Sequence, residues 1–410
     1  DHFNYLKKTE ECRYFWDDGT RLTAHSDPAE FASEAERVLG EPAKHVRAHL
    51  DLARHQYEAT KGLFLERSLH KASTYLRRDA LPALAALPSL KLTQTMHAVH
   101  AQRFRSPKMV QLFDRFATYN GSTPYQAPGT LAMIPHLEFG FGTFVPCGGM
   151  VAITESLVAL AERQGVQFHY GQPVERIRVN GRRATGLLVG GTELPADVVV
   201  SNMDVTPTYR RLLPDLKAPE KTLSQERSSS ALIFYWGVRR EFPELDLHNI
   251  LFANDYEAEF CDLFEHKTLH GDPTVYIHIT SKDLEGEAPV GGENWFVMIN
   301  APADYGQDWG SWRATARASV LAKIERALGI DVAPFIEVEE VLDPPTIQSR
   351  TGSDRGALYG ASSNNAMAAF VRHPNFHRQI PNLFFVGGSA HPGGGIPLCL
   401  LSAKIAADLG

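Results

Sequence analysis

The sequence is poor in cysteine and has no long apolar run. Its four cysteines, Cys12, Cys147, Cys261 and Cys399, stand far apart without a C-x-x-C pair, so they indicate neither a zinc site nor a disulfide framework. No uninterrupted apolar run approaches the roughly 18 residues that cross a bilayer, and no secretory signal opens the chain. These absences favour a reducing, cytoplasmic environment.

Basic residues are too few and too dispersed for a nucleic-acid surface. Lys and Arg number 41 against 48 Asp and Glu, which gives a formal net charge of -7. Because a phosphate backbone is bound by clustered positive charge, we expect no nucleic-acid partner. The 410 residues are 43% apolar and 22% charged, an ordinary composition for a globular protein with two or three packed parts.

The first 130 residues are predicted to be mainly helical after an opening hairpin. In RYFWDDGTRLTAH (13–25), the pair Asp18-Gly19 favours a tight turn between two strands. Asp27 before Pro28 predicts a helix start. The segment RRDALPALAALPSLKL (77–92) is compatible with two interpretations, a buried kinked helix or an apolar lip resting on a membrane surface. Because the chain opens on Asp1 as if in mid-segment, we expect its natural N-terminus to lie upstream.

Three further features are predicted between residues 148 and 202. Gly148-Gly149 precedes a helix in which Ile153, Leu157 and Leu160 recur at helical spacing, and Gly165 would end it. The pair Asn180-Gly181 predicts a second hairpin. The run ADVVVSN (196–202) has the continuous apolar centre of a strand buried on both faces.

Residues 231 to 301 predict an antiparallel sheet with one buried face and one face lining a cavity. Its strands would be ALIFYWGV (231–238), NILFA (249–253), TVYIHIT (274–280) and NWFVMINA (294–301). In the third strand, Val275 and Ile277 share one face while Tyr276 takes the other. Residues 311–328 have the periodicity of a helix.

The C-terminal stretch GGSAHPGGGIPLCLLSAKIAADLG (387–410) combines a strand end, glycines and a helix start. NLFFVGG (382–388) is typical of a parallel strand that enters a turn, and Pro397 suits the first turn of the following helix. A helix N-terminus offers unpaired N–H groups and about half a positive charge. Glycines at 393–395 would let a flat ring approach the backbone. The stretch is therefore suited to a flavin edge, the alternative being a glycine loop that only turns a corner.

These residues resemble the bacterial-type carotenoid desaturases, the phytoene desaturase family among the amine-oxidase-like flavoproteins. The resemblance covers nearly the whole chain in family order. It rests on VGGSAHPGGGIPLCLLSAKIAADL (386–409), GSTPYQAPGTLAMIPHLEFGFGTFVPCGGM (121–150), VERI (174–177), ADVVVSNMD (196–204), YRRLLP (209–214) and SSSALIFYWGV (228–238).

The fold implied by this resemblance is α/β (α+β). It combines a Rossmann-like FAD-binding domain of the amine-oxidase type, an antiparallel-sheet substrate domain and a helical membrane-associating region. Residues 1–140 would form the helical substrate and membrane region, 141–210 and 346–410 two segments of the FAD-binding domain, and 211–345 the substrate domain. The family's early G-x-G-x-x-G fingerprint is absent from this sequence, and we expect it upstream of Asp1.

The resemblance also implies the residues that hold FAD. Val174 would meet the adenine side, and Gly387, Gly388 and Ser389 would lie at the pyrophosphate and ribitol. The isoalloxazine ring would be edged by His391, Pro392, Gly393, Gly394, Gly395, Ile396 and Pro397. The junction of flavin and substrate tunnel would be formed by Gly148, Gly149 and Met150.

The implied reaction removes two hydrogens from a carbon pair at the end of a polyene, with hydride transfer to flavin N5 and with oxygen or a quinone as final acceptor. Phe234, Trp236, Tyr276 and Trp295 are candidates for the wall of the substrate tunnel or for plain core. His391 is the candidate catalytic residue, with a structural role as the alternative. For Asp204 and Glu138 we expect turn capping. No metal site is expected.

The branch of the family is indicated by departures from its usual tail. Ser389-Ala390 precedes His391, Gly394 replaces an alanine, and SSNNAMAAFVRHPN (362–375) is similar to the branch that desaturates the 3,4 bond of 1'-hydroxylated acyclic carotenoids. Phytoene desaturation and non-catalytic binding of a polyene or prenyl chain are the alternatives. An amine oxidase would need an aromatic pair that flanks the amine at the ring face, and the sequence does not let us assign one. We expect the protein at the cytoplasmic membrane surface, peripherally bound.

Overall fold

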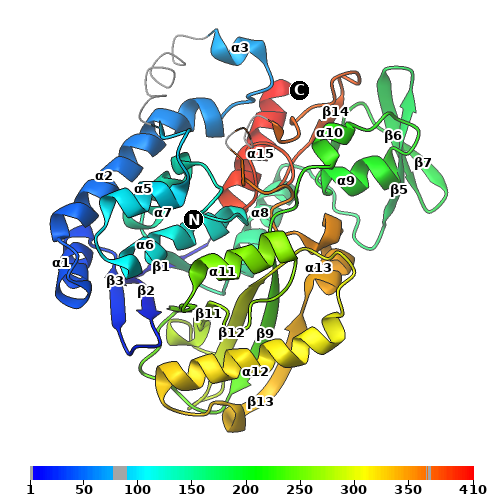
Figure 1. Ribbon diagram of the computed structural model, residues 1–410. Helices are drawn as coiled ribbons and strands as arrows, with labels where there is room; N and C mark the ends of the chain where they lie inside the picture. Colours follow the sequence, from blue (N-terminus) through cyan, green and yellow to red (C-terminus); the bar gives the residue numbers. More distant parts are fainter. Residues whose placement is uncertain (1–2, 77–89, 366, 368–370) are drawn as a thin grey trace.

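The computed structural model describes residues 3–76, 90–365, 367 and 371–410. Figure 1 shows a sheet with α12 (Trp309–Leu328) across it at the bottom, a group of helices from the first 140 residues on the left, and a third part around α15 (Ile396–Leu409) at the top. No helix in the described ranges is long and apolar enough to span a membrane.

The largest sheet among the described residues has seven strands in the order β13-β9-β12-β11-β10-β2-β3. All neighbours are antiparallel except β10 and β2, which are parallel. The bounds are β2 (Glu10–Phe15), β3 (Arg21–His25), β9 (Ser230–Val238), β10 (His248–Leu251), β11 (Val275–His278), β12 (Glu293–Ala301) and β13 (Ile336–Leu342). The four predicted strands and the first hairpin are therefore confirmed.

The sheet is apolar on the face that α12 covers. Val275 and Ile277 of β11 are fully buried there, and they pack in one core with Val320 and Ile324 of α12. Tyr276 points to the opposite face, which lines a cavity. The alternation expected for one buried and one cavity-lining face is present.

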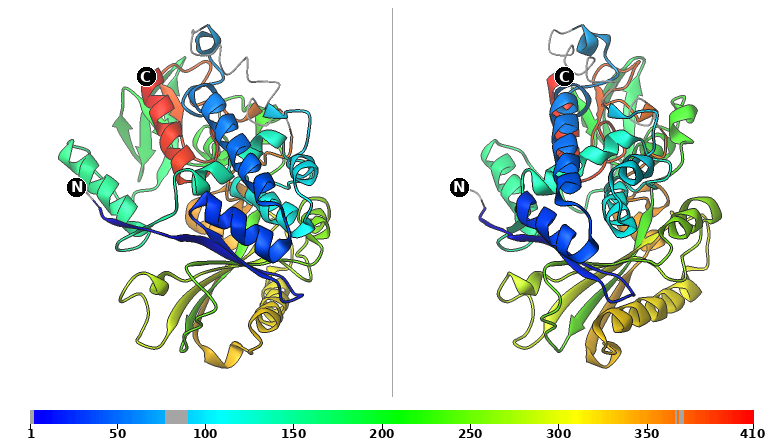
Figure 2. Two further views of the ribbon diagram at one scale, coloured as in Figure 1. Left: turned by 90° about the vertical axis from the view of Figure 1, so that its left-hand side faces the viewer. Right: turned by 60° about the vertical axis from the view of Figure 1, so that its left-hand side comes forward.

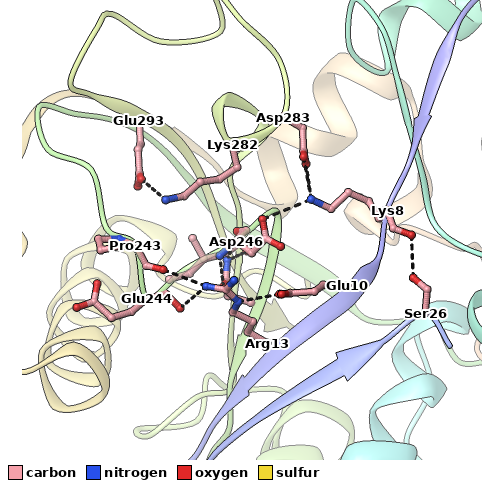
Figure 3. A network of polar contacts seen from close by, with 12 residues as sticks. Lys8, Glu10, Arg13, Ser26, Pro243, Glu244, Asp246, Lys282, Asp283 and Glu293 are labelled. Carbon is pink, nitrogen blue, oxygen red and sulfur yellow. Dashed lines mark hydrogen bonds and ion pairs between the residues drawn. The ribbon is translucent and has the colours of Figure 1, made fainter. Parts of the chain in front are cut away.

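The segment that contains the first hairpin is held by polar contacts to the loop between β9 and β10 and to the loop between β11 and β12, which Figure 3 shows. Arg13 donates hydrogen bonds to the carbonyl oxygens of Pro243 and Glu244, at 3.0 and 3.1 Å. Lys8 lies 2.8 Å from a carboxylate oxygen of Asp283. Residues 10–25, placed with the helical region by the resemblance, therefore contribute β2 and β3 to the sheet of the 211–345 region.

The helices of the first 140 residues pack beside the sheet, and the first of them begins where the sequence predicts. The Asp27 side chain accepts hydrogen bonds from the backbone N–H groups of Ala29 and Glu30 and so caps α1. The segments are α1 (Pro28–Leu39), α2 (Ala43–Thr60), η1 (Lys61–Leu65), α3 (Ala72–Tyr75), α5 (Met96–Arg103), α6 (Pro107–Asp114), η4 (Arg115–Asn120), η5 (Gly129–Met133) and α7 (Pro135–Phe139).

The third part joins distant segments of the chain. β8 (Val199–Ser201) and β14 (Leu383–Phe385) form a parallel pair, and β5 (Val174–Asn180), β6 (Arg183–Val189) and β7 (Thr192–Pro195) form an antiparallel sheet around the predicted Asn180-Gly181 turn. The two segments predicted to share one FAD-binding domain do meet in the β8–β14 pair. The domain boundaries themselves stay a prediction.

The remaining described elements connect these parts. They are β1 (Tyr5–Lys7), β4 (Phe144–Pro146), α8 (Val151–Arg163), α9 (Val205–Pro207), η6 (Thr208–Leu212), α10 (Glu220–Leu223), α11 (Tyr256–Cys261), η7 (Asp262–His266), η8 (Thr280–Lys282), η9 (Ala333–Phe335), α13 (Pro344–Thr351) and η10 (Asp354–Gly356). Figure 2 shows α8 standing out from the rest of the molecule.

One burial prediction is wrong in this third part, and one predicted helix has an exposed apolar stripe. Within β8, Val200 is 54% exposed, because the strand has a single partner strand in the described residues and its outward face is uncovered. Helix α8 forms as predicted, but Leu157 and Leu160 are exposed because no described element packs over that apolar stripe. Among the described residues, the only parallel strands in this part are β8 and β14. A Rossmann-like domain, by contrast, has a larger parallel sheet.

Candidate active site

The glycine-rich tail forms a loop between β14 and α15, as the sequence predicts. Gly387 has a φ of 96°, and a Cβ there would come within 2.6 Å of the Asn202 side-chain oxygen. Gly395, with a φ of 98°, begins α15 without a side-chain cap, and a Cβ there would meet no atom of the described residues within 4 Å. The positive end of α15 is therefore uncapped beside open space.

A mainly apolar cavity of about 470 Å³ lies against this helix start. Pro392, Gly394, Gly395 and Pro397 form one side of it, and leucine, isoleucine and methionine side chains contribute to the other. Leu90 and Leu92, from the predicted lip, line the cavity. The other leucines of that segment, Leu81, Leu84 and Leu87, lie outside the described residues.

The three glycines at 393–395 have different surroundings. A Cβ on Gly394 would approach a ring carbon of Tyr359 to 2.5 Å, and one on Gly393 would lie 3.6 Å from the Arg372 guanidinium carbon. Gly395 alone faces open space. Ile396, which follows it, is 48% exposed. The space in which a planar ring could approach the backbone therefore lies beside Gly395, the last glycine of the run.

His391 lines the apolar cavity but is itself buried. Its Nε2 lies 2.8 Å from the Arg67 carbonyl oxygen, and its Nδ1 has no hydrogen-bond partner among the described residues. Burial lowers the pKa of His391 to about 4. The side chain is thus neutral at pH 7, with an N–H that donates to Arg67 and a free lone pair on Nδ1.

The other residues predicted to hold FAD lie in the loop itself or, for Val174, on β5. The Ser389 hydroxyl accepts a hydrogen bond from the Val205 N–H at 3.0 Å, and the Gly388 carbonyl accepts one from Arg372 at 3.0 Å. Val174 opens β5, partly buried in the core of the third part. Ser389 and Gly388 are thus held within the fold by these two bonds.

The predicted junction of flavin and tunnel does not reach either cavity described here. Gly148, Gly149 and Met150 form the turn between β4 and α8, and Met150 is 53% exposed. None of the three lines the apolar cavity or the polar one described below.

The four aromatic candidates divide between core and cavity. Phe234, Trp236 and Trp295 are almost completely buried in the core beneath α12, because their positions on β9 and β12 face that helix. For these three the tunnel-wall interpretation is wrong and the core interpretation holds. Tyr276, on the opposite face of the sheet, lines a cavity.

That second cavity, of about 220 Å³, has charged and polar side chains among its apolar lining, was not predicted from the sequence, and is called the polar cavity below. It shares Tyr119 and Tyr359 with the apolar cavity, so the two adjoin. Arg115 donates to the hydroxyl groups of Tyr119 and Tyr14, at 3.1 and 3.0 Å. Glu138, expected to cap a turn, instead accepts a hydrogen bond from the Tyr119 hydroxyl.

Glu11 completes the polar cavity from β2. Its side chain accepts a hydrogen bond from the Thr143 hydroxyl, and burial raises its pKa to about 7. The sequence held one signal for this group of residues. Arg115 is a charged residue between Phe113 and Phe116 in a helical segment that is otherwise rich in apolar residues. Asp204, by contrast, caps α9 as expected, accepting from the Thr206 N–H.

The residues around α15 fit a flavin. The uncapped helix start would favour the electron-rich edge of the ring, because the N-terminal end of the helix dipole is positive. The open space beside Gly395 gives a planar group access to the backbone. The candidates to hold it are Pro392 and residues 393–397. A bound flavin would supply an acceptor for a hydride.

Known proteins resemble the chain in sequence and in fold. A family model, flavin-containing amine oxidoreductase, matches residues 2–409. A 1-hydroxycarotenoid 3,4-desaturase from a Flavobacterium species is 54% identical over 99% of this chain and 83% of that protein. A zeta-carotene-forming phytoene desaturase from Myxococcus xanthus is 31% identical over 100% and 79%.

Solved structures share the fold at low identity. A putrescine oxidase variant, 14% identical, matches 99% of this chain and 82% of its own with a TM-score of 0.59. This likeness and the family match support the amine-oxidase FAD-binding fold with mixed α/β content. On the extent and identity of these matches, the chain belongs to the flavin-containing amine oxidoreductase family and, within it, to the carotenoid desaturases.

Proposed function

We propose that the protein is an FAD-dependent desaturase that introduces a double bond between C3 and C4 of a 1-hydroxylated acyclic carotenoid. The observation that carries the proposal is the apolar cavity whose wall includes the glycine loop at Gly394 and Gly395. A hydrocarbon chain offers few polar groups, so its binding depends on burial against apolar side chains. Such a chain in this cavity would lie beside the residues that fit a flavin.

The choice of substrate is supported by the relative that is 54% identical, whose printed name is 1-hydroxycarotenoid 3,4-desaturase. That name places the hydroxyl group at C1, and the proposal uses this position rather than C1'. Phytoene desaturase is the second candidate, because proteins of that name match 86% to 100% of this chain at 28% to 31% identity.

The residues of the chain have distinct parts in this proposal. The apolar cavity binds the polyene and excludes water from it. The uncapped start of α15 favours the negative charge that hydride transfer leaves on a flavin. His391, neutral and hydrogen-bonded to Arg67, orients the loop and keeps an unprotonated Nδ1 at the cavity.

The proposal includes peripheral binding at the cytoplasmic face of the membrane, with oxygen or a quinone as final acceptor. The support is chemical: a carotenoid dissolves in the bilayer, and the apolar segment 77–92 contributes Leu90 and Leu92 to the cavity. Substrate would then pass from lipid to cavity without crossing water.

The test is turnover by the full chain supplied with FAD and lipid vesicles containing either a 1-hydroxylated acyclic carotenoid or phytoene. We expect a flavin absorption spectrum and, with the hydroxylated substrate, a product absorbing at longer wavelength because its polyene is longer. Parallel reactions under air and under nitrogen with a quinone identify the acceptor. Conversion of phytoene alone would reject the chosen substrate, and absence of flavin bands would reject the enzyme.

A further inference from the structure

The polar cavity has buried charged side chains in its lining, which an apolar substrate chain does not explain. Glu11 and Arg115 are 3% and 7% exposed, and both side chains line the cavity. Burying polar and charged groups in a site for a hydrocarbon is costly unless they gain hydrogen bonds. A pocket for an unsubstituted polyene end would be expected to carry apolar side chains here.

Several of these side chains also have hydrogen-bonding atoms to spare. Oε1 of Glu11, Nε of Arg115, Oε2 of Glu138 and the hydroxyl of Tyr256 are buried and have no hydrogen-bond partner among the described residues, although Glu138 Oε2 lies 3.7 Å from an Arg115 nitrogen in an ion pair. All four residues line the same cavity. The set offers both acceptors, on the two carboxylates, and donors, on the guanidinium and the phenol.

The position of the cavity relates it to the reacting bond. Tyr119 and Tyr359 border both cavities, and Tyr359 packs directly against Gly394 of the loop that fits a flavin. The polar cavity is therefore the immediate neighbour of that loop. In a 1-hydroxylated carotenoid only C2 separates the hydroxyl-bearing carbon from C3, so a chain placed for reaction at C3–C4 would have its hydroxyl group close to the loop as well.

We propose that the cavity lined by Glu11, Arg115 and Glu138 binds the C1 hydroxyl group of the substrate and thereby selects hydroxylated over hydrocarbon carotenoids. A hydroxyl group donates one hydrogen bond and accepts others. It donates to a carboxylate of the cavity and accepts from the guanidinium or phenol. This inference rests on the proposed function and adds to it the residues that set specificity.

The selection follows from the cost of leaving polar groups unpaired. A site built to hydrogen-bond a hydroxyl discriminates strongly against an analogue that lacks it, since the buried partners are then left without bonds. A hydrocarbon end would also displace any water from the cavity without replacing its hydrogen bonds. The expected discrimination lies in kcat/KM, because the hydroxyl is held in both ground and transition states.

The test compares two substrates, a 1-hydroxylated acyclic carotenoid and the same carotenoid without the hydroxyl, in wild type and in Glu11→Leu, Glu11→Gln and Glu138→Gln variants. We expect Glu11→Leu to lower kcat/KM for the hydroxylated substrate by about tenfold to a hundredfold and to leave or improve that for the hydrocarbon. Glu10→Gln is the matched control, because Glu10 precedes Glu11 on the chain and pairs instead with Arg13 at 2.9 Å.

A binding measurement separates specificity from folding and from chemistry. Each variant is equilibrated with vesicles carrying one carotenoid, and the pigment retained by the purified protein is measured, with circular dichroism as a check on the fold. Weaker retention of the hydroxylated carotenoid alone, in at least one folded variant, supports the assignment. Equal losses for both carotenoids in every folded variant, or an unchanged ratio, overturn it. Failure of the wild type to convert either carotenoid counts instead against the proposed function.

Discussion

Gly394 lies so close to Tyr359 that a Cβ at residue 394 would come within 2.5 Å of the tyrosine ring. The contact joins the loop after β14 to the residue that borders both cavities. It also gives a physical reason for the glycine at a position where the resemblance led us to expect alanine: in this chain the space of a methyl group is filled by Tyr359.

Gly394→Ala should therefore destabilise the protein through this contact. We expect a loss of about 1 to 3 kcal/mol in the free energy of unfolding, because overpacking forces neighbours apart. The measurement is urea unfolding of Gly394→Ala in the wild type and in a Tyr359→Ala background. The cost should shrink when the tyrosine ring is absent, although Cβ and Cα of residue 359, at 2.9 and 3.0 Å from the added methyl, retain part of it. Equal costs in both backgrounds would contradict a contribution from the ring.

Acidification should destabilise the protein between about pH 6.5 and pH 4. Burial lowers the folded-state pKa of His373 and His391 to about 4 and that of His248 to about 3. Since the unfolded chain takes up protons near pH 6.5, the stabilising contribution of these neutral histidines is complete above that pH. It is lost progressively as the pH falls towards the folded-state values.

Glu11 opposes this trend, since its pKa is raised to about 7 and its protonated form is favoured by folding as pH falls. Glu259 and Asp204 also have a raised pKa, but the histidines with a lowered pKa outnumber these carboxyl groups, because His49, His136, His278 and His377 add to the three named above, so a net loss is expected. The net loss of stability is measured from urea unfolding midpoints at about pH 7.5, 6.5, 5.5 and 4.5, which span the titration range of histidine. In a His373→Gln variant the slope should be shallower. An unchanged slope would show that His373 does not titrate in this window.

His373 is a suitable choice because its neutral form is held by two hydrogen bonds. Its Nδ1 lies 2.7 Å from the Pro374 carbonyl oxygen, to which it donates, and its Nε2 lies 3.1 Å from the Tyr209 hydroxyl, from which it accepts. Protonation of Nε2 would remove that acceptor. Glutamine retains a donor and an acceptor without a proton to gain.

Lys323 should contribute more to stability than its neighbour Arg326. Lys323 is fully buried on α12, donates to the Phe252 carbonyl at 2.8 Å and lies 2.7 Å from Asp272. We expect Lys323→Met to cost about 2 kcal/mol, as for a buried charged hydrogen bond. Arg326→Met, on the half-exposed side of the same helix, should cost about 0.5 kcal/mol. Thermal unfolding of both variants checks the order, and equal shifts would refute it.

Vesicle flotation tests peripheral membrane binding through the segment 77–92. We expect the wild-type chain to float with anionic lipid vesicles and a Leu84→Glu, Leu87→Glu double variant to remain in the soluble fraction, since charge opposes insertion of an apolar lip. Val290→Glu is the control, because Val290 is a fully exposed apolar residue elsewhere on the surface. Equal flotation of all three proteins would assign membrane binding to another surface.

Much of the fold could be predicted from local signals. Turn pairs such as Asp18-Gly19 and Asn180-Gly181, the Asp27 cap and the alternation in β11 depend on neighbours in sequence, and each is where it was predicted. The exposure of Val200 and Leu157 could not be predicted in this way. An apolar residue indicates that a face can be covered, but not which other segment lies over it.

The candidate site was predictable only where its residues are contiguous. The loop 387–397 was found because glycines, a proline and a helix start follow one another in the chain. Glu11, Arg115 and Glu138 come from β2, η4 and α7, and they meet only through tertiary packing. Likewise, whether Trp236 faces a core or a tunnel depends on which side of the sheet α12 covers.

The parallel pairing of β2 with β10 has a consequence for biosynthesis. Arg13 pairs with Asn249 across these strands, so the first hairpin finds its partner only after more than half of the chain has left the ribosome. Contacts between such distant residues slow folding, because a long loop must close before they form. The nascent hairpin is thus a candidate client for a chaperone, and refolding in its absence is expected to be slow and sensitive to protein concentration.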